Sequence, residues 1–97
     1  MFYMSDVITY EELSSVRRLG YDGNVTYCKV FDWFRRRWGY VSWIEKTGKK
    51  YNYKVYARGT FHKPIYTQSE SSYCKSYEEA QKKLLKELIL IIEETVL

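Results

Sequence analysis

The sequence predicts an α+β fold in which a three-stranded antiparallel sheet carries helices on one face, in the order α-α-β-β-β-α. Two capping-box patterns mark the starts of the first and last helices, and one stretch of strict polar–apolar alternation marks a strand. The chain has 97 residues and contains no linker or low-complexity tract. We therefore expect a single domain over residues 1–97.

The first helix begins at a T-x-x-E pattern formed by Thr9 and Glu12. In such a capping box the hydroxyl and the carboxylate each accept a hydrogen bond from a backbone N–H that the helix leaves without a partner. Leu13 and Val16 share the apolar face, and Gly20 ends the helix after roughly ten residues.

A second, shorter helix is expected over residues 29–38, closed by Gly39. A turn over residues 21–24 precedes it, and residues 25–30 suit either a short strand or the lead-in to the helix. Residues three and four apart share a helix face, so Phe31, Phe34 and Trp38 form an apolar stripe. The residues expected to turn outward are Asp32, Arg35 and Arg36.

The sheet begins with a strand over residues 39–47 and a hairpin turn at residues 48–50. The next strand, residues 51–59, alternates strictly. Its residues therefore form two alternating sets, of which the first is expected to face the helices and the second the solvent. The first set is Tyr51, Tyr53, Val55 and Ala57, and the second is Asn52, Lys54, Tyr56 and Arg58. A third strand is expected over residues 64–73, because Pro64 suits a strand start where no N–H is required.

The last helix begins at the S-x-x-E pattern of Ser76 and Glu79 and runs to about Val96. Its apolar stripe is wider than one sheet face should cover. Either this helix is buried from two sides within one chain, or its C-terminal half meets another subunit. We expect the second, which would make the protein a homo-oligomer. The interface prediction comprises Leu85, Leu88, Ile89 and Ile92.

Composition narrows the class of partner. Sixteen Lys and Arg against twelve Asp and Glu give a net charge of +4, and aromatic residues make up 19% of the chain. This mild basic bias favours an acidic partner but falls short of a dedicated nucleic-acid binder. Residues 1–12 lack the pattern of a signal peptide, and residues 84–92 are too short and too charged to span a bilayer. We expect no membrane association and a cytoplasmic location in a host cell.

No catalytic constellation is evident. His62 is the single histidine, and with Cys28 and Cys74 it does not make a convincing zinc site. No glycine-rich phosphate loop occurs, and the acidic pairs in the first turns of the two capped helices are explained by the helix dipole. The sequence therefore predicts a protein without enzymatic activity, cofactor or metal.

Two surfaces are candidates for binding. Arg35, Arg36 and Arg37 lie on the outer side of the second helix, where guanidinium groups suit phosphates or an acidic protein surface. The alternative is a core helix whose arginines are merely solvated. The second surface is the wet sheet face, where aromatic and basic side chains can bind single strands or nucleotides. Its residues are Trp43, Lys54, Tyr56 and Arg58, and its alternative is an ordinary exposed sheet face.

The order of two helices and a hairpin resembles helix-turn-helix proteins with a wing, including the excisionase and MerR-like group. That resemblance implies DNA binding, with Arg35–Arg37 along the duplex and Lys49 and Lys50 at the wing tip. The connection over residues 20–30 is longer than that motif's tight turn. Double-stranded-RNA-binding domains share the α-β-β-β-α order, but here acids replace their basic entry to the last helix.

A further resemblance covers most of the chain. Residues 8–22, 30–45, 51–59 and 76–92 occur in an order that resembles small uncharacterised proteins of Bacteroides-type gut bacteria, their phages and prophages. The matching positions are Gly20-Tyr21, Trp33-Phe34-Arg35 and Tyr77-Glu78-Glu79-Ala80. The resemblance implies a phage accessory protein that acts by binding, with counter-defence or sequestration of a nucleotide, nucleic acid or acidic host protein as its expected role. The alternatives are a winged-helix-like DNA-binding protein and a structural assembly subunit.

Overall fold

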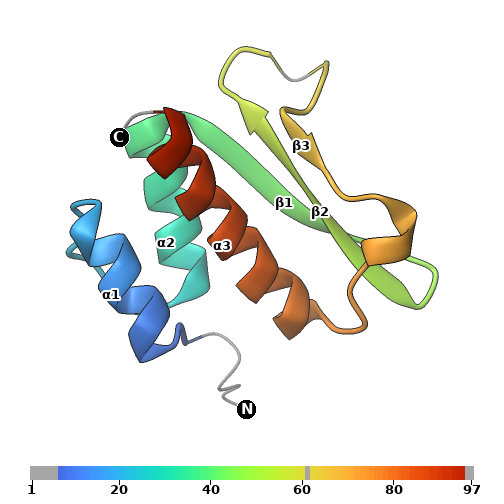
Figure 1. Ribbon diagram of the computed structural model, residues 1–97, viewed down its shortest axis with the longest axis horizontal. Helices are drawn as coiled ribbons and strands as arrows, with labels where there is room; N and C mark the ends of the chain where they lie inside the picture. The colour runs from blue at the N-terminus through green and yellow to red at the C-terminus, as the bar shows by residue number, and fades with distance from the viewer. Residues whose placement is uncertain (1–6, 61, 96–97) are drawn as a thin grey trace.

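The computed structural model describes residues 7–60 and 62–95, and its element order confirms the predicted α-α-β-β-β-α fold (Figure 1). The second helix continues directly into a π-helical turn, η2, and a short 3-10 turn, η3, precedes the last helix. The elements are α1 (Tyr10–Arg18), α2 (Tyr27–Trp33), η2 (Phe34–Trp38), β1 (Tyr40–Thr47), β2 (Lys50–Ala57), β3 (Tyr66–Thr67), η3 (Glu70–Ser72) and α3 (Tyr77–Thr95).

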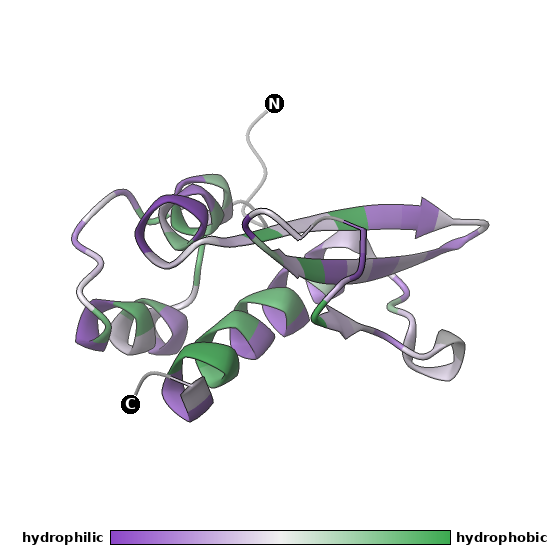
Figure 2. Ribbon diagram, turned by 90° about the horizontal axis from the view of Figure 1, so that it is seen from above, coloured by the Kyte–Doolittle hydropathy of each residue, from purple (hydrophilic) through white to green (hydrophobic). Residues whose placement is uncertain are grey.

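The sheet is antiparallel in the order β1-β2-β3, so β1 is an edge strand and β2 is central. The hairpin register pairs Trp43 with Lys54 and Val41 with Tyr56. Figure 2 shows α3 lying across one face of this hairpin, and α2 and α1 follow beside it (Figure 1). Side chains that alternate along β2 therefore divide between a face buried by α3 and an opposite face.

Both ends of α1 form as predicted. Thr9 Oγ1 accepts from the Glu12 N–H at 3.1 Å, and Glu12 Oε1 accepts from the Thr9 N–H at 2.8 Å. The Glu12 carboxylate also accepts the hydroxyl of Tyr27 at 2.7 Å, which ties α1 to the first turn of α2. Burial, and next this hydrogen bond, raise the pKa of Tyr27 above its ordinary value, so the phenol stays a donor.

The second helix begins two residues earlier than predicted, at Tyr27. Thr26 Oγ1 accepts from the Lys29 N–H at 3.4 Å and caps the helix, and Thr26 also forms an isolated antiparallel bridge with Val7. Gly39 ends it in the left-handed conformation, with φ of 80°, and β1 starts at the next residue. Glycine suits this joint because other residues are strained at positive φ.

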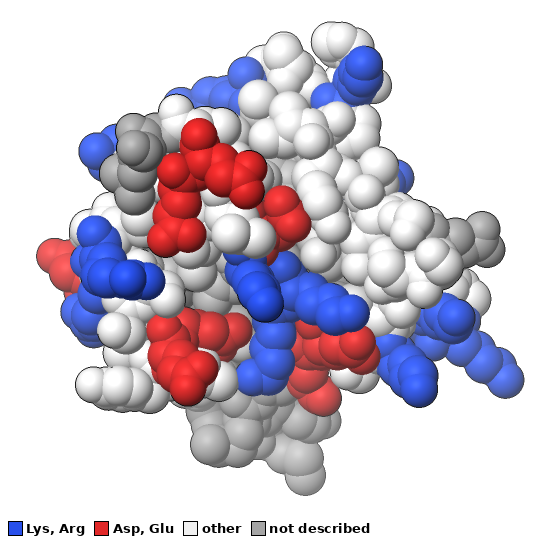
Figure 3. Space-filling model, viewed as in Figure 1, with Lys and Arg blue, Asp and Glu red and all other residues white. Residues whose placement is uncertain are grey.

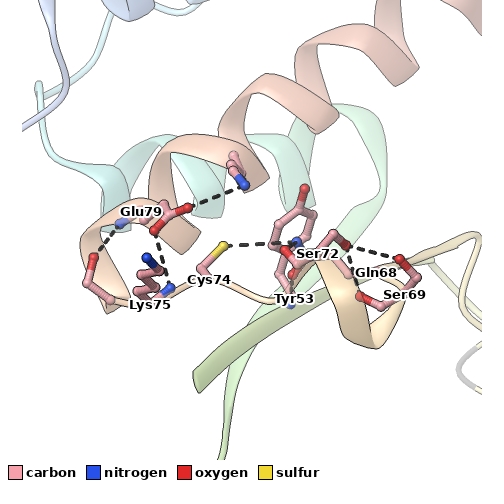
Figure 4. A network of polar contacts seen from close by, with 9 residues as sticks. Tyr53, Gln68, Ser69, Ser72, Cys74, Lys75 and Glu79 are labelled. Atoms are coloured by element: carbon pink, nitrogen blue, oxygen red, sulfur yellow. Dashed lines mark hydrogen bonds and ion pairs between the residues drawn. The ribbon is translucent and has the colours of Figure 1, made fainter. Parts of the chain in front are cut away.

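The third strand is much shorter than the predicted span over residues 64–73, since only Tyr66–Thr67 pairs as a strand. The side chain of Gln68 replaces the next stretch of strand backbone (Figure 4). Its Oε1 accepts from the Tyr53 N–H at 3.2 Å, and its Nε2 donates to the Ser72 carbonyl at 2.9 Å. The chain can therefore leave the sheet and enter η3 while the buried N–H of β2 keeps a partner.

Of the two alternatives for α3, the structure shows burial from two sides within one chain, so Leu85, Leu88 and Ile92 are not available for the predicted subunit interface. Leu85, Leu88 and Ile92 have no exposed surface, and Ile89 is half-buried. The stripe is wide because the sheet covers one side of it while α1 and α2 cover the other. Its buried neighbours in the same cluster include Val16, Val30, Phe34, Tyr53 and Val55.

Replacing Leu88 with alanine should lower the free energy of unfolding by about 2–5 kcal/mol, because the cavity lies in a fully enclosed core. The matched control is Leu90→Ala on the same helix, where the side chain is 39% exposed and the expected change is within about 0.5 kcal/mol. Urea denaturation followed by circular dichroism measures both. Equal effects at the two positions would contradict this description of the core.

Candidate functional site

Four arginines gather where the second helix meets the sheet. Arg35, Arg36 and Arg37 occupy the π-helical turn η2, and all three are exposed while Phe34 beside them is completely buried. The predicted outward direction of Arg35 and Arg36 is confirmed. Arg58 immediately follows β2 and reaches the same place from the sheet. We call Arg35, Arg36, Arg37 and Arg58 the arginine ridge.

Asp32 holds two members of the ridge. Its carboxylate pairs with the Arg35 guanidinium, and its Oδ2 lies 2.9 Å from Arg36 Nε. The hydrogen bond from Arg35, followed by the nearby charge of Arg36, lowers the pKa of Asp32 below its ordinary value. The Arg36 side chain is 74% exposed despite this contact, so most of its donor edge still faces solvent. The carboxylate therefore orients these arginines without enclosing them.

Arg37 is held by an aromatic ring instead. Its guanidinium carbon lies 4.4 Å from the centroid of the Trp38 ring, a cation–π arrangement, while the residue as a whole is exposed. Trp38 packs edge-on against Trp33, with ring centroids 6.3 Å apart. The tryptophans that surround the arginines in sequence thus serve as their support.

Arg58 joins the two surfaces that the sequence predicted separately. Its Nη2 donates to the Arg35 carbonyl at 2.5 Å, and its backbone N–H donates to the Gly39 carbonyl at 2.8 Å. A guanidinium group at a helix C-terminus also complements the negative end of the helix dipole. Part of the role of Arg58 is therefore to fix the end of η2, which sequence spacing could not reveal across 23 positions.

Most side chains on the rest of the predicted sheet surface already contact partners within the chain. Tyr56 is only 8% exposed and stacks on Trp43, with ring centroids 4.6 Å apart and an interplanar angle of 25°. Lys54 Nζ lies 3.5 Å from Glu45 Oε1, which also accepts from Trp43 Nε1 at 3.0 Å. The expectation that Asn52 and Tyr56 face solvent is therefore wrong. Asn52 is 3% exposed and donates to Thr47 Oγ1 at 2.8 Å, and the diagonal cross-strand contact with Trp43 buries Tyr56. Trp43, 38% exposed, retains one accessible side.

Glu45 is a member of this cluster that sequence analysis missed. Its position two residues after Trp43 on the same strand was the available signal, since residues i and i+2 share a sheet face. Its carboxylate offsets the positive charge of Lys54.

Lys49 and Lys50 lie at the hairpin turn, at the opposite end of β1 from Gly39 (Figure 1). The eight residues of β1 separate them from the ridge by about 26 Å. Figure 3 shows basic and acidic side chains intermixed over the face formed by α1 and α3. The hairpin is also built into the core through Tyr53 and Val55, unlike a wing that stands away from its helices.

Comparison of the chain with protein-family models, curated proteins and solved structures gives no match. Within residues 7–60 and 62–95 no three metal-ligating side chains gather into a group that could hold an ion. No helix in the same residues is long and apolar enough to cross a membrane.

The pKa of Asp32 provides a direct test of the ridge geometry. Arg35→Gln should raise it toward its ordinary value more than Arg36→Gln does, because the hydrogen bond from Arg35 is the larger cause. Arg37→Gln is the control and should leave it unchanged, since Arg37 lies over Trp38. An NMR pH titration of the carboxyl carbon measures all three.

Because folding lowers the pKa of Asp32, the free energy of unfolding depends on pH. A lowered pKa in the folded state means that the stabilisation by Asp32 is present above the unfolded pKa and is lost as the pH falls through the folded one. Equal titration of Asp32 in wild type and Arg35→Gln would contradict the described contact.

Proposed function

We propose that the protein is a non-enzymatic binding protein whose arginine ridge attaches to an acidic macromolecule. The observation that carries this proposal is the charge balance of the ridge: four guanidinium groups meet one carboxylate, that of Asp32, in the ion pairs of the described residues. Each guanidinium is held by a carboxylate, a ring or a carbonyl. Fixed arginines lose less conformational entropy on binding, and their forked donors match phosphate and carboxylate oxygens.

A macromolecule is favoured over a free nucleotide because all four ridge arginines are exposed side chains. None of them lines the groove between α2, β1 and α3 or the two described beside α1. Small ligands are usually bound in concave sites, whereas an exposed row of arginines suits a nucleic-acid backbone or the acidic surface of a protein.

Resemblance to small phage and prophage proteins supports a biological setting for this binding. An accessory protein without catalytic groups can act by covering or sequestering a host component, and counter-defence is the role we propose. Binding by the ridge does not require a second subunit, because its four arginines and Asp32 all come from one chain.

Replacing Arg36 and Arg37 with glutamine should each weaken binding to labelled DNA and lower the slope of log K against log salt by about 0.9, the value for one phosphate contact. Arg18→Gln, which removes an exposed arginine from α1, is the matched control and should leave the slope unchanged. Fluorescence anisotropy with duplex and single-stranded probes at several salt concentrations provides the measurement.

Polyglutamate serves as the second probe in the same titration. Binding to polyglutamate but not to DNA, with the same dependence on Arg36 and Arg37, would assign the partner as an acidic protein. Binding to neither probe, or binding that both variants retain in full, would contradict the proposal.

A further inference from the structure

A second surface lies in the fork between α2 and β1. These elements diverge from Gly39, and α3 runs between them (Figure 1). The fork contains a groove of about 540 Å³, with one wall from α2, one from the edge strand and a third from α3. Residues that define it are Cys28, Phe31, Ser42, Ile44, Gln81 and Leu84.

The edge strand presents backbone groups to this groove. The N–H and C=O groups of Tyr51 bond to Cys74, and the Val55 carbonyl accepts from Ile65, so the odd-numbered residues of β2 point away from β1. In an antiparallel pair the even-numbered residues of β2 then bond to Val41, Trp43 and Glu45 of β1. The alternate residues, Ser42 and Ile44, consequently direct their N–H and C=O groups outward.

These outward groups have no backbone partner elsewhere in the described chain. They are spaced two residues apart, which is the repeat of an extended strand. An exposed strand edge of this kind is a template for one more strand.

Gln81 gives an independent indication of a ligand. The residue is 5% exposed and lines the groove from α3, yet its Oε1 is buried and meets no hydrogen-bond donor among residues 7–60 and 62–95. A buried acceptor without a donor is costly, so native proteins usually provide one. Gln68, by contrast, uses both ends of its amide to complete the other side of the sheet.

The residues that line the groove also indicate what kind of ligand it can bind. No lysine, arginine, aspartate or glutamate contributes to it, whereas Phe31, Ile44 and Leu84 supply apolar surface. A phosphate-bearing ligand would find no countercharge there, and a purely apolar ligand would leave the edge and Gln81 unpaired. Because α2 and α3 flank the strand edge, the space suits one isolated strand rather than the edge of a folded sheet.

We propose that this groove binds an extended, uncharged peptide segment of a partner protein, which adds to β1 as a further strand. The peptide backbone would pair with Ser42 and Ile44, and the Gln81 amide would turn so that its Oε1, which has no donor among the described residues, accepts from the peptide. Alternate peptide side chains would then face the apolar surface of Phe31 and Leu84. This mode obtains affinity from main-chain hydrogen bonds and selectivity from side-chain pockets.

The test uses the full chain and a displayed library of random linear peptides of about nine residues. Affinity of a selected peptide is measured by calorimetry for wild type and for Ser42→Pro, which removes the outward N–H but no hydrogen bond of the β1–β2 ladder. We expect a loss of affinity of about tenfold or more. Ser42→Ala keeps the N–H and should bind as wild type, and Gln81→Met should weaken binding.

Circular dichroism checks that Ser42→Pro is folded, and N-methylation of alternate peptide residues tests the same hydrogen bonds in the unmodified protein. Arg36→Gln should leave peptide affinity unchanged, which separates this site from the arginine ridge. Peptide binding that survives both Ser42→Pro and every N-methylated position would overturn the proposal, as would a library that yields no such peptide. Slow exchange of the Ser42 and Ile44 amides without peptide would also overturn it, since residues 1–6 or a second copy would then already pair with the edge.

Discussion

Leu84, Leu85, Leu88 and Ile92 turn one broad face of α3 toward the interior, and burial of that face organises the other elements. Val55 and Tyr53 of β2 cover part of it. A flat sheet face cannot cover the remainder, so α1 and α2 pack along the helix and enclose its other side. In so small a chain this shared core supplies most of the apolar burial that stabilises the fold.

This packing also explains why the two candidate binding surfaces lie where they do. Because α2 packs beside α3, it does not lie over the edge strand, and the chain reverses at Gly39 to enter β1. The outside of that reversal carries the arginine ridge, and the inside of the fork forms the groove. One surface is strongly basic and the other uncharged, so they suit partners of different chemistry and can be tested by separate substitutions.

The aromatic residues serve mainly to connect elements. Tyr27 reaches Glu12 on α1, Tyr53 stacks on Tyr66 of the short third strand, and Trp43 covers Tyr56 across the hairpin. Such pairs add directional contacts to apolar burial, and tyrosine hydroxyls find polar partners at the edge of the core. The high tyrosine content therefore serves mainly to hold the helices and the small sheet together. It is less consistent with a platform on which bases would stack.

Some features depend only on residues within four positions of one another. These are the caps at Thr9 and Thr26 and the outward direction of Arg36. The alternation of side chains along β2 depends on a simple two-residue repeat. Sequence by itself was sufficient to determine the helix starts at Thr9 and Ser76, the element order and the exposed arginines, because these depend on local hydrogen bonds and periodicity. At Ser76 the hydroxyl accepts from the Glu79 N–H at 3.1 Å as predicted, but the Glu79 carboxylate accepts from the Lys75 N–H at 3.2 Å and not from Ser76. The capping function of Thr26 was not anticipated, although its local pattern was present.

Only the tertiary structure decided which distant side chains meet. Arg58 reaches the Arg35 carbonyl, Gln68 replaces strand backbone opposite Tyr53, and Tyr56 is buried by Trp43 on a face expected to be wet. The width of the α3 stripe likewise came from two covering layers within one chain rather than from a second subunit. Each of these outcomes depends on how packing aligns segments far apart in the chain, and local spacing contains no information about that alignment.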